Sequence, residues 1–556
     1  MKQLTIAGER MLITVASVVY LLLFDQTVPH GDAMRIVRQI DAGQLIWNPN
    51  HLLFDPLGYW LFNLVRAYWP NVAALDLFEI ISAISTVVSL FAFHAILVRL
   101  GITNAAARML ASLLLFGSAA FLSVAISQYY FMIQMPVLMA ALYIYICAMA
   151  DDQSTRARDM KMYAIGAILA VATAIMFNNL LLVLACGIGV AWSNASWREL
   201  EWRRAAQLYA GAALVGLPIF TVGHVLSGVD ANLFQWVLAY EGNVESSLNE
   251  VYGAKWTVGE LVRGMAMVGF KFTIGSLVNP AGLGTILAKV TFGGQLEFTP
   301  NWLRIAVGVA AIPVAITVSL RAAFYAVTRL KADPFIRFLS LWVGAYLCFN
   351  FLWNVGDEIF WFQILPIIWI LFLMSLLCRR GAVLGTVTAS GVGPDEEWPI
   401  IKLATVGALL IVVNTFNAVL PWADREYLDK QRVHADLLRE GDLEIIPGWD
   451  QQKWMMLPPN AVKVDRLILV NLAIGSGGSA EKLEDLPEIV RTRLDSGGRV
   501  VVARLFDIDD DMMPWYSLQD RGWPRARLQS LLSEFCSRPL ATIDGVVLRE
   551  IVYCEH

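Results

Sequence analysis

The chain has 556 residues and is 57% hydrophobic but only 16% charged, with a mean hydropathy of +0.57. A soluble domain normally has about a quarter of its residues charged, so this composition excludes an ordinary soluble protein. The net charge of −5 provides no basic surface for nucleic acid, and we expect no nucleic-acid partner.

Apolar runs of about 20 residues recur through the first three quarters of the chain, and this is the length that crosses a membrane as a helix. Lipid offers no partners to backbone groups, so each run must pair them internally. The predicted spans are 8–24, 74–98, 106–126, 129–150, 162–177, 179–193, 206–226, 304–321, 336–353, 359–377 and 401–420. The sequence therefore predicts a polytopic α-helical membrane protein with about 11–13 transmembrane helices.

Two of the apolar segments leave alternatives open. The segment 260–292 is interrupted by Gly, Pro and Lys, so it is either a re-entrant or interfacial segment or one or two further spans. The first run, 8–24, has no small-residue cleavage site behind it, so we interpret it as a retained helix and not as a signal peptide.

Arginine and lysine gather in the loops on one side of this arrangement, and such loops normally face the cytoplasm. The opposite side then carries a first outer loop, 25–73, a long outer loop, 227–303, the short turn "NVGDEIF" and the chain after about residue 421. We therefore expect a multi-pass protein of a bacterial inner membrane whose larger loops lie in the periplasm.

The tail, 421–556, has a different composition, with 17 Lys and Arg against 23 Asp and Glu. Its segments "RLILVNL", "GGRVVVARLF" and "GVVLREIVY" are typical of strands, and "AEKLEDLPEIVRTRLDSG" of a helix between two of them, which predicts a small α/β domain with a partly parallel sheet. The glycines of "AIGSGGSAEKLEDL" suit either a tight turn, which we favour, or a phosphate or sugar site. Cys536 and Cys554 are either buried thiols or, if the tail is exported, a disulfide.

The first outer loop concentrates polar chemistry between two amphipathic segments. "DAMRIVRQIDAGQLI" has an apolar stripe that includes Val37 and Ile40, with Arg35 and Arg38 able to meet lipid phosphates. "DPLGYWLFNLVRAYWP" has a Tyr- and Trp-rich apolar face. Both segments are predicted to be interfacial helices.

The order of features in this loop carries a family resemblance. Asp32 follows the first apolar run and begins "DAMRIVRQIDAG", Gly43 ends that segment, and "DPLGYW" comes next. This order resembles the GT-C superfamily of membrane glycosyltransferases, in particular the protein O-mannosyltransferases and the lipid A aminoarabinose transferases, which use lipid-phosphate-linked sugars. The resemblance implies a GT-C-like transmembrane catalytic module over 1–420 and a periplasmic α/β domain over 421–556.

The resemblance implies that Asp32 is the catalytic carboxylate, which takes a proton from the acceptor hydroxyl. The leaving polyprenyl phosphate needs fixed cations or polar contacts. Arg35, Arg38 and His51 are the nearby candidates, and the more distant basic ones are Arg66, Lys255, Arg263, Lys271 and Arg304. Asp32 as a helix N-cap, Asp25 as the acid, arginines that only reach lipid headgroups and a structural His51 remain alternatives.

The sequence also departs from the aminoarabinose-transferase pattern. That type has a lysine directly before its pair of prolines, where this chain has Phe54, and the first proline is replaced by Asp55. A second acid beside the catalytic one is replaced by Ala33. These departures put the donor or acceptor class in question.

Two further polar groups lie in the predicted outer loops. Glu241, Glu245 and Lys255 in the long loop are candidates for an acceptor-binding or lid segment, and Asp357 and Glu358 for donor contacts. The acids of the long loop are joined by no His or Cys, so we expect no dedicated transition-metal site, although a divalent cation such as Mg or Mn held by carboxylates is an alternative.

The predicted function is transfer of a sugar from a polyprenyl-phosphate-linked donor to a glycan, lipid or protein acceptor. The short cytoplasmic loops leave no room for a nucleotide-sugar domain, which favours a lipid-linked donor. The alternatives are a transporter or flippase of a lipid-linked saccharide, and a non-catalytic envelope assembly or sensor protein. A transporter is expected to show repeated halves and buried charges, and the sequence shows neither clearly.

Overall fold

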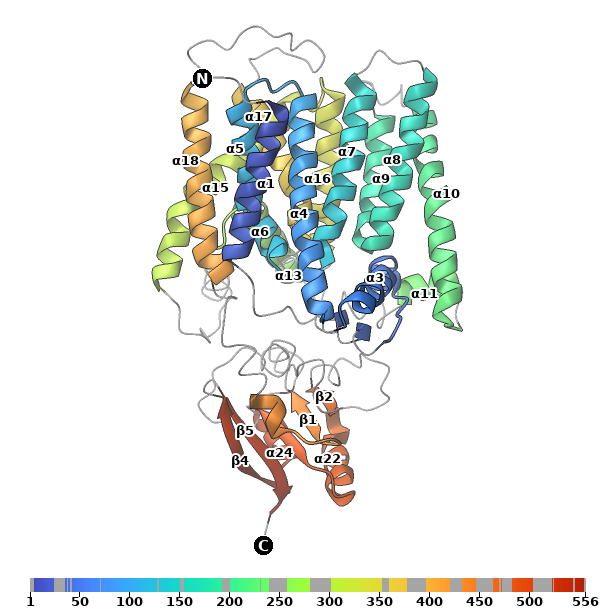
Figure 1. The fold of residues 1–556 in the computed structure, drawn as a ribbon, viewed down its shortest axis with the longest axis vertical. Coiled ribbons are helices and arrows are strands. Elements are labelled where there is room, and N and C mark those ends of the chain that lie inside the picture. The colour runs from blue at the N-terminus through green and yellow to red at the C-terminus, as the bar shows by residue number, and fades with distance from the viewer. Residues whose placement is uncertain are drawn as a thin grey trace.

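The computed structural model describes residues 5–24, 36–37, 39–40, 43–70, 72–127, 130–150, 155–192, 201–230, 232–239, 258–280, 302–352, 360–377, 397–420, 433–446, 464–469, 472, 483–503, 523, 525–543 and 546–554. The helices up to residue 414 form one bundle, and the strands form a separate sheet, with two helices of its own, at the end of the bundle opposite the N-terminus (Figure 1). We call this end of the bundle the sheet end.

Each of the eleven predicted spans coincides with a helix or with a pair of helices. They are α1 (Ile6–Leu23), α4 (Ala74–Arg99), the pair α5 (Ala105–Gly117) and α6 (Ala119–Ala125), α7 (Gln134–Ala150), α8 (Thr155–Ile175), α9 (Leu180–Ala191), α10 (Trp202–Ser227), α15 (Trp302–Arg329), α16 (Pro334–Leu352), α17 (Leu365–Leu377) and α18 (Glu397–Asn414). A single large hydrophobic core runs through the bundle, with Trp342, Trp361 and Trp369 fully buried in it.

Seven of the described helices are long and apolar enough to cross a membrane, and the bent pair α5–α6 makes an eighth. The helices over the other three predicted spans are α9 and α17, which are shorter, and α8, whose first turns carry Arg156, Arg158, Asp159 and Lys161. The chain is therefore a multi-pass membrane protein, as predicted.

The pair α5–α6 is bent by 73° where the sequence predicted one continuous span. The break lies at Ser118 and leaves the first amides of α6 without helical partners. The amides of Ala119 and Ala120 instead donate to the carbonyls of Leu277 and Ser276, both at 3.0 Å. A distant segment of the chain thus completes the broken span.

That segment follows α13 (Val258–Phe270) and a π-helical turn, Lys271–Gly275. The side chain of Asn414 in α18 donates to the carbonyls of both Gly117 and Leu277 at 2.7 Å. The described residues 258–280 are thus a short helix and a turn that bond to the middle of other helices. They fit the predicted re-entrant alternative, because the end of the segment bonds to the broken span α5–α6 and to α18 inside the bundle.

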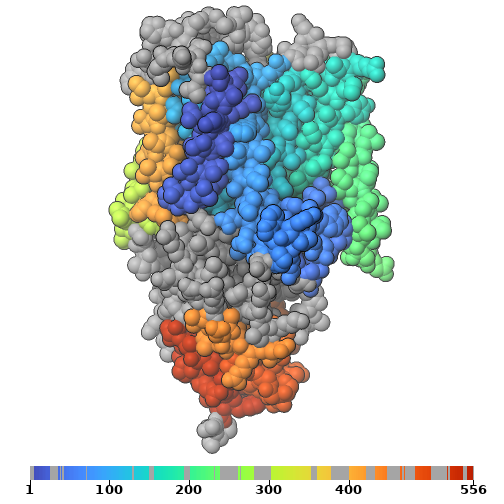
Figure 2. All heavy atoms as spheres, viewed as in Figure 1, coloured from blue at the N-terminus to red at the C-terminus, as the bar shows by residue number. Residues whose placement is uncertain are grey.

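The predicted second helix of the first outer loop is α3 (Phe54–Tyr68), which lies at the sheet end of the bundle (Figure 1). Its outer face exposes large apolar side chains, and Figure 2 shows this helix on the molecular surface beside the end of α10. The exposed residues are Leu57, Trp60, Leu61, Leu64 and Tyr68. This aromatic, apolar face matches the predicted interfacial helix.

The first predicted interfacial helix of this loop is described at only four residues, which are helical. Ile36, Val37 and Ile40 are at most 4% exposed and belong to the bundle core. Their apolar stripe therefore packs on the protein, and the expectation that it lies in lipid was wrong for these residues. The stripe instead fastens the loop to the bundle.

The sheet has the strand order β2-β1-β3-β5-β4. The strands are β1 (Leu443–Ile446), β2 (Asp465–Ile468), β3 (Val500–Ala503), β4 (Phe535–Ile543) and β5 (Val546–Tyr553). The first three pair in parallel and the last two are antiparallel, so the predicted partly parallel α/β sheet is confirmed. Helices α22 (Leu486–Asp495) and α24 (Arg525–Leu531) pack with it around a core of its own.

The sequence analysis did not predict two strands of the sheet, and it left the state of two cysteines open. The strands β1 and β4 were not predicted. Cys536 and Cys554 form a disulfide, with their Cα atoms 4.8 Å apart, so of the two alternatives the disulfide is the one present. It joins the first residues of β4 to the end of β5.

Candidate functional site

His51 lies within the described part of the chain, as do Arg66, Lys271 and Arg304 among the distant basic candidates. The other predicted site residues lie outside it, and they are Asp32, Arg35, Arg38, Glu241, Glu245, Lys255, Asp357 and Glu358. The alternative acid, Asp25, also lies outside the described residues. The surroundings of His51 are therefore the part of the predicted site whose geometry can be followed.

His51 ends a short 3-10 turn, η1 (Pro49–His51), which is fixed at both sides. The side chain of Asn48 caps it by accepting the amide of Asn50 at 2.8 Å. After the turn, the amide of Leu53 donates to the carbonyl of Ala174 at the end of α8, also at 2.8 Å. The turn packs against α8, α10 and the loop between α8 and α9. The first outer loop is thus held rigidly where it crosses the sheet end of the bundle.

Phe54 and Asp55, which replace the lysine and proline of the aminoarabinose-transferase pattern, begin α3. The Phe54 ring is 2% exposed and lies 5.1 Å from the ring of Phe78, centroid to centroid. Asp55 is 5% exposed and lies beside Ile36, Gln39, Ile40, Gln44 and Ile46. The side chain at position 54 is thus a packing residue, where the aminoarabinose-transferase pattern has a lysine.

Buried amide side chains gather beside η1, inside the sheet end of the bundle. Asn179 lies in the 3-10 turn η3 (Phe177–Asn179), which joins α8 to α9 and packs against η1. Its amide donates to the side chain of Gln134 at 2.8 Å and to the carbonyl of Ala172 at 2.9 Å, and it accepts the hydroxyl of Tyr346. These three side chains bond one another across α7, η3 and α16.

Other amides nearby are buried without such partners. Gln363 is fully buried in the 3-10 turn η7 (Phe362–Ile364), and neither polar atom of its side chain has a hydrogen-bond partner among the described residues. The same holds for Asn178, which is 7% exposed, and for Oδ1 of the fully buried Asn350. An unpaired buried polar group costs about 1–3 kcal/mol, so their unmet hydrogen bonds call for an explanation.

One face of α16 connects these amides. Trp342, Tyr346 and Asn350 follow one another at intervals of four residues, so they share a helix face. Trp342 donates to the backbone carbonyl of Gln363 at 3.4 Å, and Asn350 to that of Phe360 at 2.9 Å. Because Tyr346 bonds Asn179 from the same face, the turns η3 and η7 both lie against α16.

A row of aromatic rings links His51 to this face. The ring centroids of His51 and Phe131 are 6.3 Å apart, those of Phe131 and Phe360 are 5.8 Å apart, and Phe360 accepts the bond from Asn350. We define the amide cluster as Gln134, Asn178, Asn179, Asn350 and Gln363. It lies beneath the first outer loop. Four of its members lie inside predicted spans and Asn178 lies between two of them, and no sequence pattern joined the five.

Two of the distant basic residues lie at the re-entrant segment. Lys271 begins the π-helical turn and is 9% exposed. Arg304, at the start of α15, donates to the carbonyl of Asn417 at 2.9 Å, and Asn417 in turn donates to the carbonyl of Asn279. Arg66 instead lies over the ring of Phe62, 5.6 Å from its centroid. The turn that Lys271 begins lies beside Ser319 of α15, which bonds the carbonyls of Phe272 and Thr273, whereas Arg304 lies near Asn279, so the two basic residues are at different ends of the re-entrant segment.

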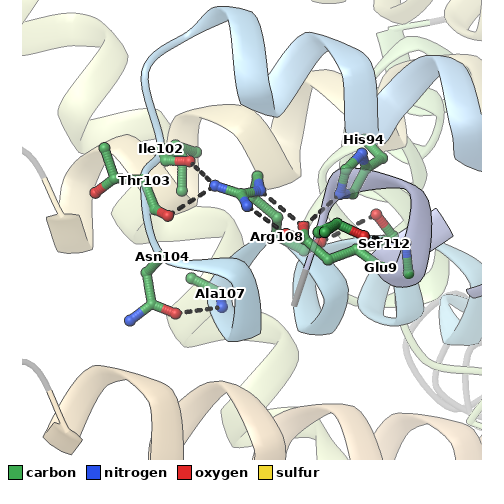
Figure 3. A network of polar contacts seen from close by, with 10 residues as sticks. Glu9, His94, Ile102, Thr103, Asn104, Ala107, Arg108 and Ser112 are labelled. Carbon is green, nitrogen blue, oxygen red and sulfur yellow. Dashed lines mark hydrogen bonds and ion pairs between the residues drawn. The ribbon is translucent and has the colours of Figure 1, made fainter. Parts of the chain in front are cut away.

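A second buried polar network, at the other end of the bundle, is separate from this site (Figure 3). Glu9 of α1 is fully buried and bonds His94 of α4 and Arg108 of α5. Both oxygens of the carboxylate bond to side chains of neighbouring helices, so its role is to hold helices together. The sequence analysis had not identified it, because the three residues are far apart in the chain.

Among the described residues, no group of three or more His, Cys, Asp or Glu side chains is arranged to hold a metal ion. The carboxylates proposed for a divalent cation, Glu241 and Glu245, lie outside the described residues.

The fold has clear relatives among solved structures. It matches ArnT from Cupriavidus metallidurans in the apo state with a TM-score of 0.52, at 13% identity and over 98% of both chains. It matches the apo oligosaccharyltransferase of Archaeoglobus fulgidus with a TM-score of 0.57, at 11% identity, over 96% of this chain and 73% of that one. The oligosaccharyltransferase AglB from the same organism, in complex with an inhibitory peptide and a dolichol-phosphate, gives 0.53 at 10% identity, over 98% and 74%.

Comparisons by sequence give no such match, since no family model matches the chain and no curated protein does. The structural matches are to membrane glycosyltransferases of the GT-C superfamily. At these identities they show the fold alone. The chain has the GT-C fold, and the resemblance drawn from its first outer loop is confirmed at that level.

Proposed function

We propose that the protein is a membrane glycosyltransferase that moves a sugar from a polyprenyl-phosphate-linked donor to an acceptor at the sheet end of the bundle. The observation that carries this proposal is the fold match over 98% of both chains with ArnT. The similar oligosaccharyltransferase AglB was solved with a dolichol-phosphate, which supports a lipid-phosphate carrier.

The proposed chemistry centres on Asp32 in the first outer loop. Its carboxylate takes the proton from the acceptor hydroxyl as the oxygen attacks the anomeric carbon of the donor sugar. The bond from that carbon to the carrier phosphate breaks, and the phosphate leaves with its negative charge. Arg35 and Arg38, six residues or fewer from Asp32, are proposed to stabilise that charge, and His51 to contact the sugar or phosphate.

The remaining polar loops are assigned supporting roles. Asp357 and Glu358 are proposed to contact the donor, and Glu241, Glu245 and Lys255 to cover it or to recognise the acceptor. We propose that 1–420 forms the catalytic module and that 421–556 lies with the site in the periplasm of a bacterial cell. The disulfide between Cys536 and Cys554 supports that placement, because disulfides persist in oxidising compartments.

The test uses the full chain in lipid nanodiscs. We would measure binding of undecaprenyl phosphate, and release of labelled sugar from a panel of undecaprenyl-phosphate-linked pentoses and hexoses in the presence of envelope extracts. Asp32→Asn is expected to lower transfer by about 10²- to 10⁴-fold and to leave binding of undecaprenyl phosphate unchanged. Asp41→Asn, a carboxylate of the same loop with no proposed role, serves as the matched control and is expected to keep wild-type transfer.

Transfer at the wild-type rate by Asp32→Asn would show that Asp32 is not the base. A wild-type protein that neither binds undecaprenyl phosphate nor releases sugar from any donor would reject the proposed function. Repeating the assay with EDTA, and then with added Mg²⁺ or Mn²⁺, determines whether a divalent cation takes part.

A further inference from the structure

We infer that the amide cluster binds an uncharged, hydroxyl-rich group, which in the proposed reaction is a neutral sugar of the lipid-linked donor. This inference rests on the proposed function and adds the class of sugar to it. It also names residues for that role which lie inside or between predicted spans, far in sequence from the first outer loop.

The first argument is the state of the amides themselves. Four polar side-chain atoms, two of Gln363 and two of Asn178, have no hydrogen-bond partner among the described residues, although both side chains are at least 93% buried. Burying an unpaired amide loses its hydrogen bonds to water without a replacement. Natural proteins rarely keep such groups unless a ligand or ordered water pairs with them.

The second argument is the contrast with their neighbours. Gln134 and Asn179 are equally buried and their side chains are bonded, to each other and to Met176, Ala172 and Tyr346. This region therefore provides hydrogen-bond partners for two of its buried amide side chains. Gln363 and Asn178 differ because their hydrogen-bonding atoms are left for something that is not part of the chain's described residues.

The third argument is chemical complementarity. A side-chain amide offers two donors and an acceptor, and a sugar hydroxyl both donates and accepts, so amides pair well with hydroxyls. The five residues of the cluster carry no charge, so they supply no counter-ion for a cationic aminosugar.

The fourth argument is location. The row from His51 through Phe131 and Phe360 to Asn350 leads from the first outer loop, where Asp32 is proposed to act, to the cluster. Position 54, a lysine in the aminoarabinose-transferase pattern, holds a buried phenylalanine here. The row therefore connects the loop of the proposed base to the cluster, which is where the donor sugar is expected in the proposed reaction.

The decisive variant is Gln363→Leu in the full chain. Because the Gln363 side chain has no partner to lose, leucine of similar volume should leave the apparent melting temperature unchanged or raise it. Gln134→Leu is the matched control, since it removes a bonded amide at the same burial and should lower the melting temperature. Asn178→Leu repeats the test at a second position.

The probes are undecaprenyl phosphate alone, undecaprenyl-phosphate-linked glucose and undecaprenyl-phosphate-linked aminoarabinose, with affinities measured in nanodiscs. In the wild type we expect the glucose-linked lipid to bind more tightly than the bare carrier. Gln363→Leu should weaken binding of the glucose-linked lipid about tenfold, the loss of a hydrogen bond or two, and leave binding of bare undecaprenyl phosphate unchanged.

Three results would overturn the inference. If Gln363→Leu and Asn178→Leu bind the glucose-linked lipid as the wild type does, the amides pair only with water. If the variants weaken binding of the bare carrier equally, the cluster acts on the carrier or on the fold and not on the sugar. If the wild type prefers the aminoarabinose-linked lipid, the sugar is not neutral. In all three cases the carrier still binds, so the proposed function survives, whereas loss of carrier binding by the wild type would reject both.

Discussion

Arg108 and Glu9 form a two-point ion pair inside the bundle, with Nε–Oε2 at 2.9 Å and Nη2–Oε1 at 2.5 Å (Figure 3). His94 lies 2.7 Å from the same Oε2. Arg108 also donates to the carbonyls of Ile102 and Thr103, which close the turn between α4 and α5. Since Glu9 is one of only three buried residues of α1, this network fixes the position of the helix that leads into the first outer loop.

Replacing Glu9 with Gln should strongly destabilise the protein. The substitution leaves the Arg108 guanidinium buried without its counter-charge, and breaking a buried pair in this way costs about 3–5 kcal/mol. We expect a lower apparent melting temperature and a shorter half-life at fixed temperature in detergent. Asp159→Asn is the control, because its partner Arg203 is 73% exposed and such a pair contributes about 1 kcal/mol or less. Equal losses in both variants would show that the Glu9 network is not specially important.

The helical part of the fold was largely predictable, because apolar runs of membrane length leave a strong signal in the sequence. The break at Ser118 was not predictable, because only Gly117 and Ser118 interrupt the apolar run there, which is a weak signal. The partners that replace the missing helical bonds come from the distant residues Ser276 and Leu277. The strands β1 and β4 were missed because their sequence patterns are weak. The strand β1 has only four residues, and β4 contains Pro539, which is tolerated because β4 is an edge strand.

The site was predictable only in its acidic loop, where Asp32, Gly43 and the aromatic segment stand close together in sequence. Gln363 gave no signal, because a lone amide inside an apolar run looks like a polar interruption of a span. Asn178 lies between two predicted spans, where an amide is typical of a turn. Their importance appears only when α16 brings η3 and η7 together. The Glu9 network was missed because 85 and 99 residues separate Glu9 from its two partners.

Asn414→Leu should loosen the re-entrant segment. The Asn414 side chain donates to the carbonyls of Gly117 and Leu277 and accepts the amide of Asn279 at 2.9 Å, so leucine leaves three buried backbone groups without this partner. A loss of about 2–3 kcal/mol is expected, visible as faster hydrogen exchange in peptides covering 271–280. Thr405→Val, which removes only an exposed bond to its own helix, should leave that exchange unchanged. Unaltered exchange in Asn414→Leu would contradict the assigned role.

Cys536→Ser should destabilise the β4–β5 hairpin without affecting sugar transfer. The disulfide to Cys554 closes a loop of 18 residues, and chain-entropy arguments give about 3 kcal/mol for a loop of that size. Hydrogen exchange in peptides covering 535–553 should accelerate in Cys536→Ser and after reduction of the wild type. Cys348→Ser removes a free, exposed cysteine of α16 and is the control. If reduction left the exchange of the hairpin unchanged, the disulfide would not support this sheet.

Tyr553 should make the sheet's stability fall at high pH. Its hydroxyl donates to Asp495 at 2.5 Å, and this bond raises the pKa of Tyr553 above its usual value of 10.0, because the bond exists only while the phenol keeps its proton. A group whose pKa is higher in the folded state stabilises that state below its unfolded pKa. The stabilisation is lost as the pH rises through the folded value.

Tyr553→Phe removes that bond at every pH. The wild type should therefore have the higher apparent melting temperature from pH 7 to about 10, by a small margin since the tyrosine is 47% exposed, and the difference should disappear at higher pH. Comparing the two proteins at each pH cancels the other titrating groups. Tyr68→Phe, at an exposed position on α3, should show no pH-dependent difference from the wild type. A wild-type advantage that persists unchanged at pH 11 would mean that the Tyr553 hydroxyl does not act through its proton to Asp495.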